Sequence, residues 1–221
     1  MRTIAIVGAG TGLGLAVARR FGREGFSVAL IARNSEHLSS LEATLAAEGI
    51  KARGFTANVR EAESLRSALS EAAAQFGPIE VLQYSPVPAK EFMRPVLETT
   101  ADDLVGPIEF SIFGPATAVQ QVLPDMRDMG RGTILFVNGA SAIRPRGAVA
   151  GTSIAFAGES AYGQLLHDAL APEGIHAAQL IIPLGIGGGD PAHEPTALAE
   201  NLWDIHLNRG PFRTFAAPLS D

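Results

Sequence analysis

The stretch TIAIVGAGTGLG at residues 3–14 decides the fold, because it joins a short apolar run to a glycine-rich turn. Thr3–Val7 has the composition of a buried strand, and the residues after the turn repeat their apolar side chains at helical spacing. Gly8 permits a tight turn, Gly12 lets a pyrophosphate approach the backbone, and Gly14 allows close packing of helix on strand. We therefore expect a strand, a turn and a helix whose first N–H groups face a phosphate.

The turn and the end of the next strand together predict which nucleotide binds. The predicted turn contacts are Gly8, Gly10, Thr11, Gly12, Leu13 and Gly14. Sites for NAD commonly carry an acidic residue after the second strand, but this chain has Arg33 there, and a guanidinium suits a 2′-phosphate. NADP(H) is therefore favoured over NAD(H). The alternatives are a tight turn without a nucleotide and, for Arg33, a solvated surface charge.

Apolar strands alternate with helical patterns along the rest of the chain. Further strands are expected at 26–31, 51–56, 79–83, 132–138, 175–182 and 212–216, and helices at 12–24, 35–48, 61–76, 102–129, 151–171 and 196–207. Strict alternation predicts an α/β fold in which helices cover both faces of a parallel sheet. We expect one Rossmann-type doubly wound sheet of about seven strands, in a single dinucleotide-binding domain over residues 1–221.

Composition excludes several classes of function. The formal net charge is −6 and no basic face stands out, which argues against nucleic acid as a partner. The chain has no cysteine, so disulfides and thiolate chemistry are excluded, and its histidines lack metal-ligand spacing. No secretion signal and no apolar run long enough for a membrane helix is recognisable. We expect a cytoplasmic protein with no membrane partner and no metal site.

Several motifs together resemble the short-chain dehydrogenase/reductase family over nearly the whole chain. They are Gly8-x-x-x-Gly12-x-Gly14, Phe113-Gly114, Val122-Leu-Pro-Asp-Met126, Ala171-Pro-Glu-Gly-Ile175 and Ile182-Pro-Leu-Gly185. The resemblance implies an adenine contact at Asn58-Val59, where the family usually has an acid before the valine. It also implies cofactor contacts after the fourth and sixth strands, at Ser85, Pro183, Gly185 and Ile186.

The residues that carry the chemistry of that family are replaced here. Counting back from Gly174-Ile175 without gaps places Thr152 at the position of the family's proton-transferring Tyr and Phe156 at that of its Lys. The same alignment places Gly139 at the family's Ser and Ser111 at its helix Asn, and no Tyr-x-x-x-Lys occurs anywhere in the chain. Hydride transfer would then leave an alkoxide without a proton donor.

Three other side chains are candidates for that chemistry, and an acid lies near them. Tyr84, at the end of the fourth strand, is a candidate substitute acid, and the alternative is a ring that packs over the cofactor pocket. Ser141 and Ser153 could polarise a carbonyl, and the alternatives are a loop hydroxyl and a hydroxyl at a helix start. Glu159 lies one helical turn beyond Phe156, but an isolated acid on a helix is expected to be solvated or capped.

The predicted function is that of an NADP(H)-binding oxidoreductase acting on a small carbonyl or alcohol compound. The alternative is a catalytically inactive nucleotide-binding sensor or partner subunit. The loops at 144–150 and 185–195 are expected to line the substrate pocket. Residues 104–123 and 149–166 carry one charge each, Glu109 and Glu159, so these helices need cover on more than one face and predict a homodimer or homotetramer. The alternative is burial under the chain's own loops.

Overall fold

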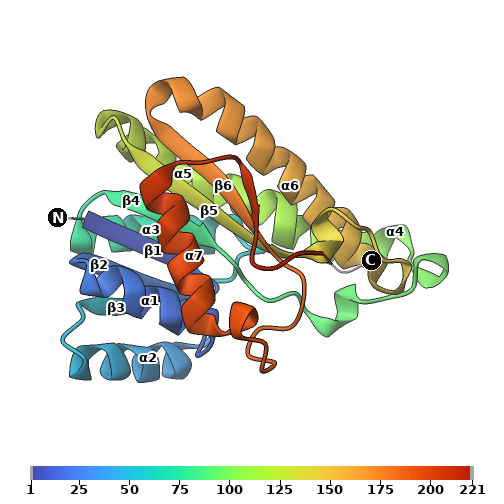
Figure 1. Cartoon of the computed structure of the whole chain (residues 1–221), viewed down its shortest axis with the longest axis horizontal. Helices are drawn as coiled ribbons and strands as arrows, with labels where there is room; N and C mark the ends of the chain where they lie inside the picture. Colours follow the sequence, from blue (N-terminus) through green and yellow to red (C-terminus); the bar gives the residue numbers. More distant parts are fainter. Residues whose placement is uncertain (1, 220–221) are drawn as a thin grey trace.

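A computed structural model describes residues 2–219 and contains one seven-stranded parallel sheet (Figure 1). The strand order is β3-β2-β1-β4-β5-β6-β7, with parallel pairing throughout. The strands are β1 (Arg2–Val7), β2 (Phe26–Ala32), β3 (Ala52–Thr56), β4 (Ile79–Tyr84), β5 (Gly132–Gly139), β6 (Ile175–Ile182) and β7 (Arg213–Phe215). The predicted doubly wound sheet is confirmed. Its order reverses between β1 and β4, where such folds bind ligands.

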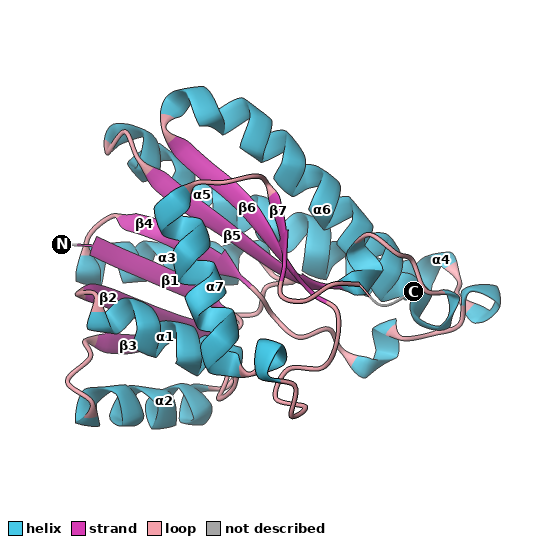
Figure 2. Ribbon diagram, viewed as in Figure 1, coloured by secondary structure: helices cyan, strands magenta, loops and turns pink. Residues whose placement is uncertain are grey.

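Helices cover both faces of the sheet, as Figure 2 shows. One face packs against α1 (Leu13–Arg23), α2 (Ser35–Ala47) and α7 (Pro195–Asn208). The other packs against α3 (Ala62–Phe76), α5 (Gly114–Asp128) and α6 (Ala150–Leu170). Side chains of each strand alternate between the two cores, so that in β1 Ile4 and Ile6 enter one core and Ala5 and Val7 the other. Within the described residues, no helix is both long and apolar enough to cross a membrane.

The long helix predicted at residues 102–129 forms, but a π-helical turn divides it. It consists of α4 (Ala101–Ile108), the π-turn Glu109–Phe113, and α5. Pro115 has no N–H to donate to the carbonyl of Ser111, four residues before it. The N–H of Gly114 instead donates to the carbonyl of Glu109, five residues back. Turns of this kind are rare and are frequently found at functional sites.

Parallel pairing brings the loops that follow the strands to one edge. The loops after β1, β2, β4, β5 and β6 all leave from the carboxyl ends of their strands. Short 3₁₀ turns, Lys90–Phe92 and Val96–Glu98, lie in the loop after β4, and Ala140–Ala142 follows β5. The candidate site is therefore built from segments that are far apart in the sequence.

Candidate functional site

The glycine-rich turn has the geometry that its sequence predicts. Gly8 has a φ of +95°, and a Cβ added there would lie 2.5 Å from Cα of Pro86. A Cβ on Gly14 would lie 3.0 Å from Cα of Ala9. A side chain at either position would collide with backbone, so these two glycines make the turn and the helix packing.

Gly10 and Gly12 behave differently, because no atom lies within 4 Å of a Cβ added at either. The space over them opens onto the first turn of α1, which no side chain caps and which holds no acidic residue. Backbone N–H groups and the positive end of the helix dipole therefore face open space. A phosphate group fits this arrangement.

Arg33 follows β2 at the same edge of the sheet. Its side chain is exposed and has no hydrogen-bond or ion-pair partner in the part of the chain that the structure describes. It lines a surface hollow with Asn34, Ser35 and Glu36, at the start of α2. Asn34 caps this helix by accepting a hydrogen bond from the N–H of His37 at 2.9 Å. A guanidinium without a protein partner is free to bind an anion here, next to the carboxylate of Glu36.

Asn58 is half-buried and already engaged in the turn before α3. Its Nδ2 donates to Oε1 of Glu61 at 2.7 Å, and its Oδ1 accepts from the N–H of Arg60 at 3.2 Å. Val59 beside it packs against the hydrophobic core. Ser85 lies against the turn, because its N–H donates to the carbonyl of Val7 at 2.9 Å. The structure thus places these residues along the same edge as the glycines.

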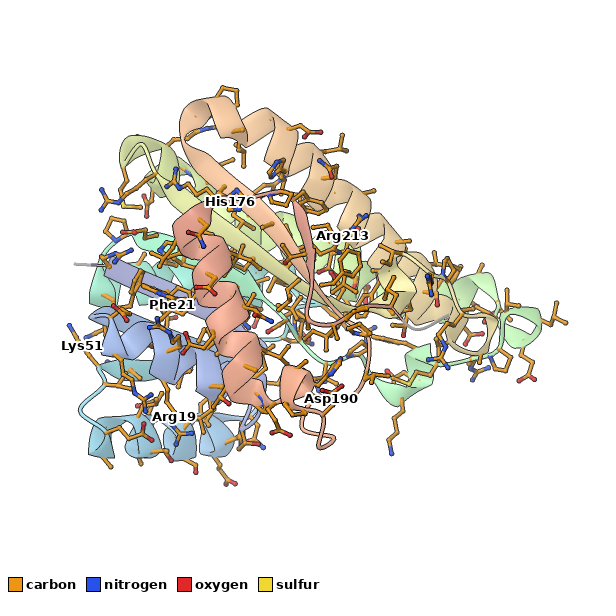
Figure 3. All side chains as sticks on the ribbon, in the orientation of Figure 1. Arg19, Phe21, Lys51, His176, Asp190 and Arg213 are labelled. Atoms are coloured by element: carbon orange, nitrogen blue, oxygen red, sulfur yellow. The ribbon has the colours of Figure 1, made fainter. Side chains whose placement is uncertain are left out.

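The loop after β6 carries Pro183, Gly185 and Ile186 and is exposed from residue 184 to residue 191. His193 is 1% exposed and closes this loop on itself. Its Nε2 accepts from the N–H of Leu184 at 3.3 Å, and its Nδ1 lies 3.0 Å from Oδ2 of Asp190, which is labelled in Figure 3. A compact loop therefore stands at the carboxyl edge with the apolar side chains of Leu184 and Ile186 exposed.

The positions that correspond to the family's catalytic residues come together, although their chemistry differs. Ser111, Thr152 and Phe156 line one small, closed cavity that has no room for a water molecule. The other lining residues are mostly apolar: Pro88, Phe92, Pro107, Phe110 and Ala155. Phe92, Phe110 and Phe156 belong to one buried apolar cluster. Three of the four positions given by the gap-free alignment therefore line one cavity, and the fourth, Gly139, does not line it.

Tyr84 is part of the core and not of the cleft. Its side chain is 1% exposed, and its hydroxyl donates to the carbonyl of Phe110 at 2.5 Å. The π-turn frees this carbonyl, because its α-helical donor, Gly114 N–H, bonds Glu109 instead. Burial, and then the charge of Glu159, hold the pKa of Tyr84 well above its usual value. This placement argues against Tyr84 as a substitute acid and favours packing, not over the cofactor pocket but against α5.

The two candidate serines differ in their surroundings. Oγ of Ser153 accepts from the N–H of Arg146 at 3.0 Å and donates to the carbonyl of the same residue at 3.2 Å. Ser153 is buried, so this position favours a hydroxyl that fastens the helix start to the loop. Ser141 lies in the 3₁₀ turn after β5 and is partly exposed at the carboxyl edge. It stays the predicted group for polarising a carbonyl.

Glu159 is where the structure overturns an expectation. The side chain is 1% exposed instead of solvated. Burial raises the pKa of its carboxyl to about 8, and nearby Asn138 and Ser111 oppose that rise without cancelling it. The sequence does hold one signal of this burial, since Glu159 is the single charge in the apolar run at 149–166. A helix that is apolar over the whole of residues 149–166 is expected to be buried on several faces, and its single acid is then expected to lie in the interior.

A chain of buried amides joins this acid to the last strand. Nε2 of Gln179 donates to Oδ1 of Asn138 at 2.8 Å. Oε1 of Gln179 in turn accepts from Oγ of Ser160 at 2.9 Å and from Nε of Arg213 at 2.9 Å. Figure 3 labels Arg213, which comes from β7. Asn138 is thereby held at the end of β5, beside the loop that carries Ser141.

Other buried ionisable groups lie at the opposite end of the strands. His206 accepts from Arg2 Nη2 at 3.0 Å, so its proton lies on Nδ1, 2.8 Å from Oγ1 of Thr133. Burial lowers the pKa of His206, and that of His176, to about 4. Among residues 2–219, no three histidine or acidic side chains gather as metal ligands. These groups stabilise the amino edge of the sheet.

Comparison with known proteins agrees with this architecture. The family model described as short chain dehydrogenase matches residues 2–186. The human protein "Dehydrogenase/reductase SDR family member 4" is 27% identical over 143 residues, which cover 64% of this chain and 51% of that protein. The matches span about half the length of such curated relatives.

Solved structures match over nearly the whole chain. A short-chain dehydrogenase from Rhodopseudomonas palustris is 27% identical, has a TM-score of 0.87 and is covered over 98% of both chains. An NADPH-bound short chain oxidoreductase from Pseudomonas aeruginosa PAO1 that contains an atypical catalytic center has a TM-score of 0.85. It is 19% identical, and 97% of this chain and 95% of that chain are covered, so that likeness concerns the fold alone.

Proposed function

The chain belongs to the short-chain dehydrogenase family, and from that premise we propose that it binds NADP(H) and transfers hydride to or from a small carbonyl or alcohol compound. The observation that carries the proposal is the open space over Gly10 and Gly12 at the uncapped start of α1, with the unpartnered Arg33 at the same edge. The free backbone N–H groups, the positive end of the helix dipole and the guanidinium of Arg33 all suit phosphate groups. NADP complexes of structural neighbours are consistent with it.

Each part of the edge has a proposed role toward the nucleotide. The first turn of α1 would hold the pyrophosphate, and Arg33 the 2′-phosphate. Asn58 and Val59 would contact the adenine. Ser85 and the loop at 183–186 would border the nicotinamide, whose reduced form supplies the hydride. Ser141, partly exposed at the end of β5, would donate a hydrogen bond to the carbonyl oxygen of the substrate.

Binding is tested by fluorescence titration with NADPH and NADH. We expect Arg33→Ala to weaken NADPH binding about 10-fold or more, since a hydrogen bond to a charged group contributes about 1.5–3 kcal/mol. NADH binding should change little, because NADH lacks the 2′-phosphate. Arg23→Ala, an exposed arginine at the far end of α1, is the matched control and should alter neither affinity. An equal loss for both nucleotides would refute the role of Arg33, and no binding of either would refute the function.

A second candidate function is that of a nucleotide-binding sensor or partner subunit without turnover. The observation that favours it is the apolar cluster of Phe92, Phe110 and Phe156, which occupies the place of the family's proton-transfer groups. A panel of aldehydes and ketones, incubated with protein and NADPH, separates the two candidates. Oxidation of NADPH with any of them supports the enzyme, whereas tight binding without oxidation across the panel supports the sensor.

We also propose that the chain assembles as a homodimer or as a tetramer of dimers. Large apolar side chains are exposed in the two segments with one charge each, residues 104–123 and 149–166. Phe113 is 59% exposed, Ile154 47% and Leu165 68%. Exposed large apolar side chains on both segments are candidates for an interaction surface. Light scattering should give at least twice the mass of one chain, and Leu165→Glu should shift the species toward the monomer. A monomeric wild type would refute the assembly.

A further inference from the structure

Three buried polar atoms without hydrogen-bond partners lie around α6 and the end of β5. They are Nδ2 of Asn138, Oγ1 of Thr152 and Oε1 of Glu159. Each of the three residues is less than a tenth exposed. Buried polar atoms are almost always paired, and an unpaired one costs about 1–3 kcal/mol. Asn138 neighbours Glu159, and Thr152 lies about two turns before Glu159 on α6, so these buried groups call for a functional reason.

Glu159 differs from Glu80, another acid that is nearly fully buried. Glu80 lies 3.1 Å from Arg2 and 3.2 Å from Arg131, so two cations face it. Glu159 has no cation beside it among the described residues, and its polar neighbours are Ser111 and Asn138. A buried acid without a counter-ion is held in its neutral form, in which it can donate a proton.

Ser111 connects this acid to the cavity. Its side chain faces the carboxyl of Glu159 and it also lines the cavity that Thr152 borders. The π-turn sets this position, because the extra residue in that turn changes the direction of the side chains that follow it. The hydroxyl of Ser111 therefore stands between a neutral carboxylic acid and the space where the family's catalytic residues would meet a substrate.

Building on the proposed function, we propose that Glu159 is the proton source of this site and passes its proton through the Ser111 hydroxyl to the oxygen of the reduced substrate. The reduced nicotinamide, when bound, would supply hydride with its electron pair to the carbonyl carbon, and the carbonyl π pair would pass to oxygen. That oxygen takes the Ser111 proton while Ser111 takes the proton of Glu159. The products are the alcohol, the oxidised nicotinamide and a Glu159 carboxylate, which water reprotonates before the next turnover.

A substrate can reach Ser111 only if part of the chain moves. Pro88 and Phe92 close the cavity from the loop after β4, and in this closed form it holds neither a substrate nor a water molecule. The 3₁₀ turn Lys90–Phe92 must therefore move outward when the substrate binds. The Thr152 hydroxyl then supplies a hydrogen bond to the same oxygen, which gives its unpartnered Oγ1 a partner.

The test compares Glu159→Gln, which keeps shape and polarity but has no proton to give, with Glu71→Gln on the exposed surface of α3 as the matched control. Infrared spectra at pH 7 should show the carbonyl band of a protonated carboxyl that Glu159→Gln abolishes and Glu71→Gln leaves intact. NADPH oxidation with the panel of aldehydes and ketones should fall about 100-fold or more in Glu159→Gln, as for loss of a general acid. NADPH affinity should be unchanged.

Further variants separate proton supply from folding. Glu159→Asp keeps the carboxyl and should recover part of the rate, and Ser111→Ala should lower the rate without removing the infrared band. A wild-type spectrum without that band, or a Glu159→Gln rate equal to that of the wild type, would overturn this proposal alone. Wild-type protein that does not bind NADPH, or that oxidises it with no compound of the panel, would overturn the proposed function and this proposal together.

Discussion

Replacing Glu159 with glutamine should make the chain more stable, and increasingly so as the pH rises. The pKa of this carboxyl is raised from 4.5 to about 8, so the folded chain keeps a proton that the unfolded chain releases in that interval. When the folded state binds more protons, the free energy of unfolding falls with rising pH. The contribution of Glu159 is therefore most favourable below pH 4.5, declines up to about pH 8 and is constant above it.

The magnitude follows from the shift. At about 1.4 kcal/mol per pH unit, the wild type should lose about 3 kcal/mol between pH 5 and pH 8 through this group. Glutamine has no such proton, so the stability difference between Glu159→Gln and wild type should grow by that amount. Urea unfolding at pH 5, 6, 7 and 8 and at one protein concentration measures it.

Taking the difference between the two proteins removes the other titrating groups. His176 and His206 have their pKa values lowered to about 4, so they impose the opposite slope on the wild type below pH 6.5, and they cancel when the variants are compared. Glu71→Gln should show a difference that does not vary with pH. A difference for Glu159→Gln that is equally flat would refute the reasoning, because it would mean that Glu159 titrates alike in the folded and unfolded chains.

The remaining predictions concern single contacts. Gly114→Ala should destabilise the chain by about 3 kcal/mol or more, since its methyl group would collide with the Tyr84 hydroxyl. Tyr84→Phe should lower the stability by about 1–2 kcal/mol, because it leaves the Phe110 carbonyl without a hydrogen bond. Urea unfolding of each variant measures both effects. Gly10→Ala should leave the melting temperature within a few degrees of wild type but weaken NADPH binding, and unchanged affinity would contradict the phosphate cradle. His206→Gln should reduce the loss of stability on acidification from pH 6.5 to 4 by about 2.5 kcal/mol, because the folded pKa of about 4 makes the unfolded chain bind the proton first. Unfolding measured as a function of pH checks this.

The fold could be predicted from the sequence because its signals are local. Apolar runs bounded by glycines, such as Thr3–Val7 before Gly8, mark strands and turns without reference to distant residues. The structure gives the seven parallel strands in the doubly wound order. A Cβ on Gly8 would meet Pro86 and one on Gly14 would meet Ala9, and only the structure shows these two contacts.

The interior of the candidate site could not be predicted in the same way. Tyr84 was expected near the cofactor, but its position in β4 turns it toward α5, where the π-turn provides a free carbonyl. That turn interrupts a helix whose sequence pattern reads as continuous, and Pro115 lies two residues after it. Glu159 was expected to be solvated or capped because an isolated acid prefers water. The apolar run around it indicates that several faces of α6 are covered, but not which elements cover them.

The sequence by itself determined the alternation of strands and helices, the glycine turn with its exposed arginine, and the absence of a Tyr-x-x-x-Lys pair. Only the tertiary structure decided that Ser111 and Thr152 share a cavity and that Glu159 lies buried beside Ser111. The physical reason is that burial, and with it the protonation of an acid, depends on which elements pack around a side chain. Those elements, β5 and the π-turn, lie about 20 to 50 residues from Glu159 along the chain and meet it only after folding.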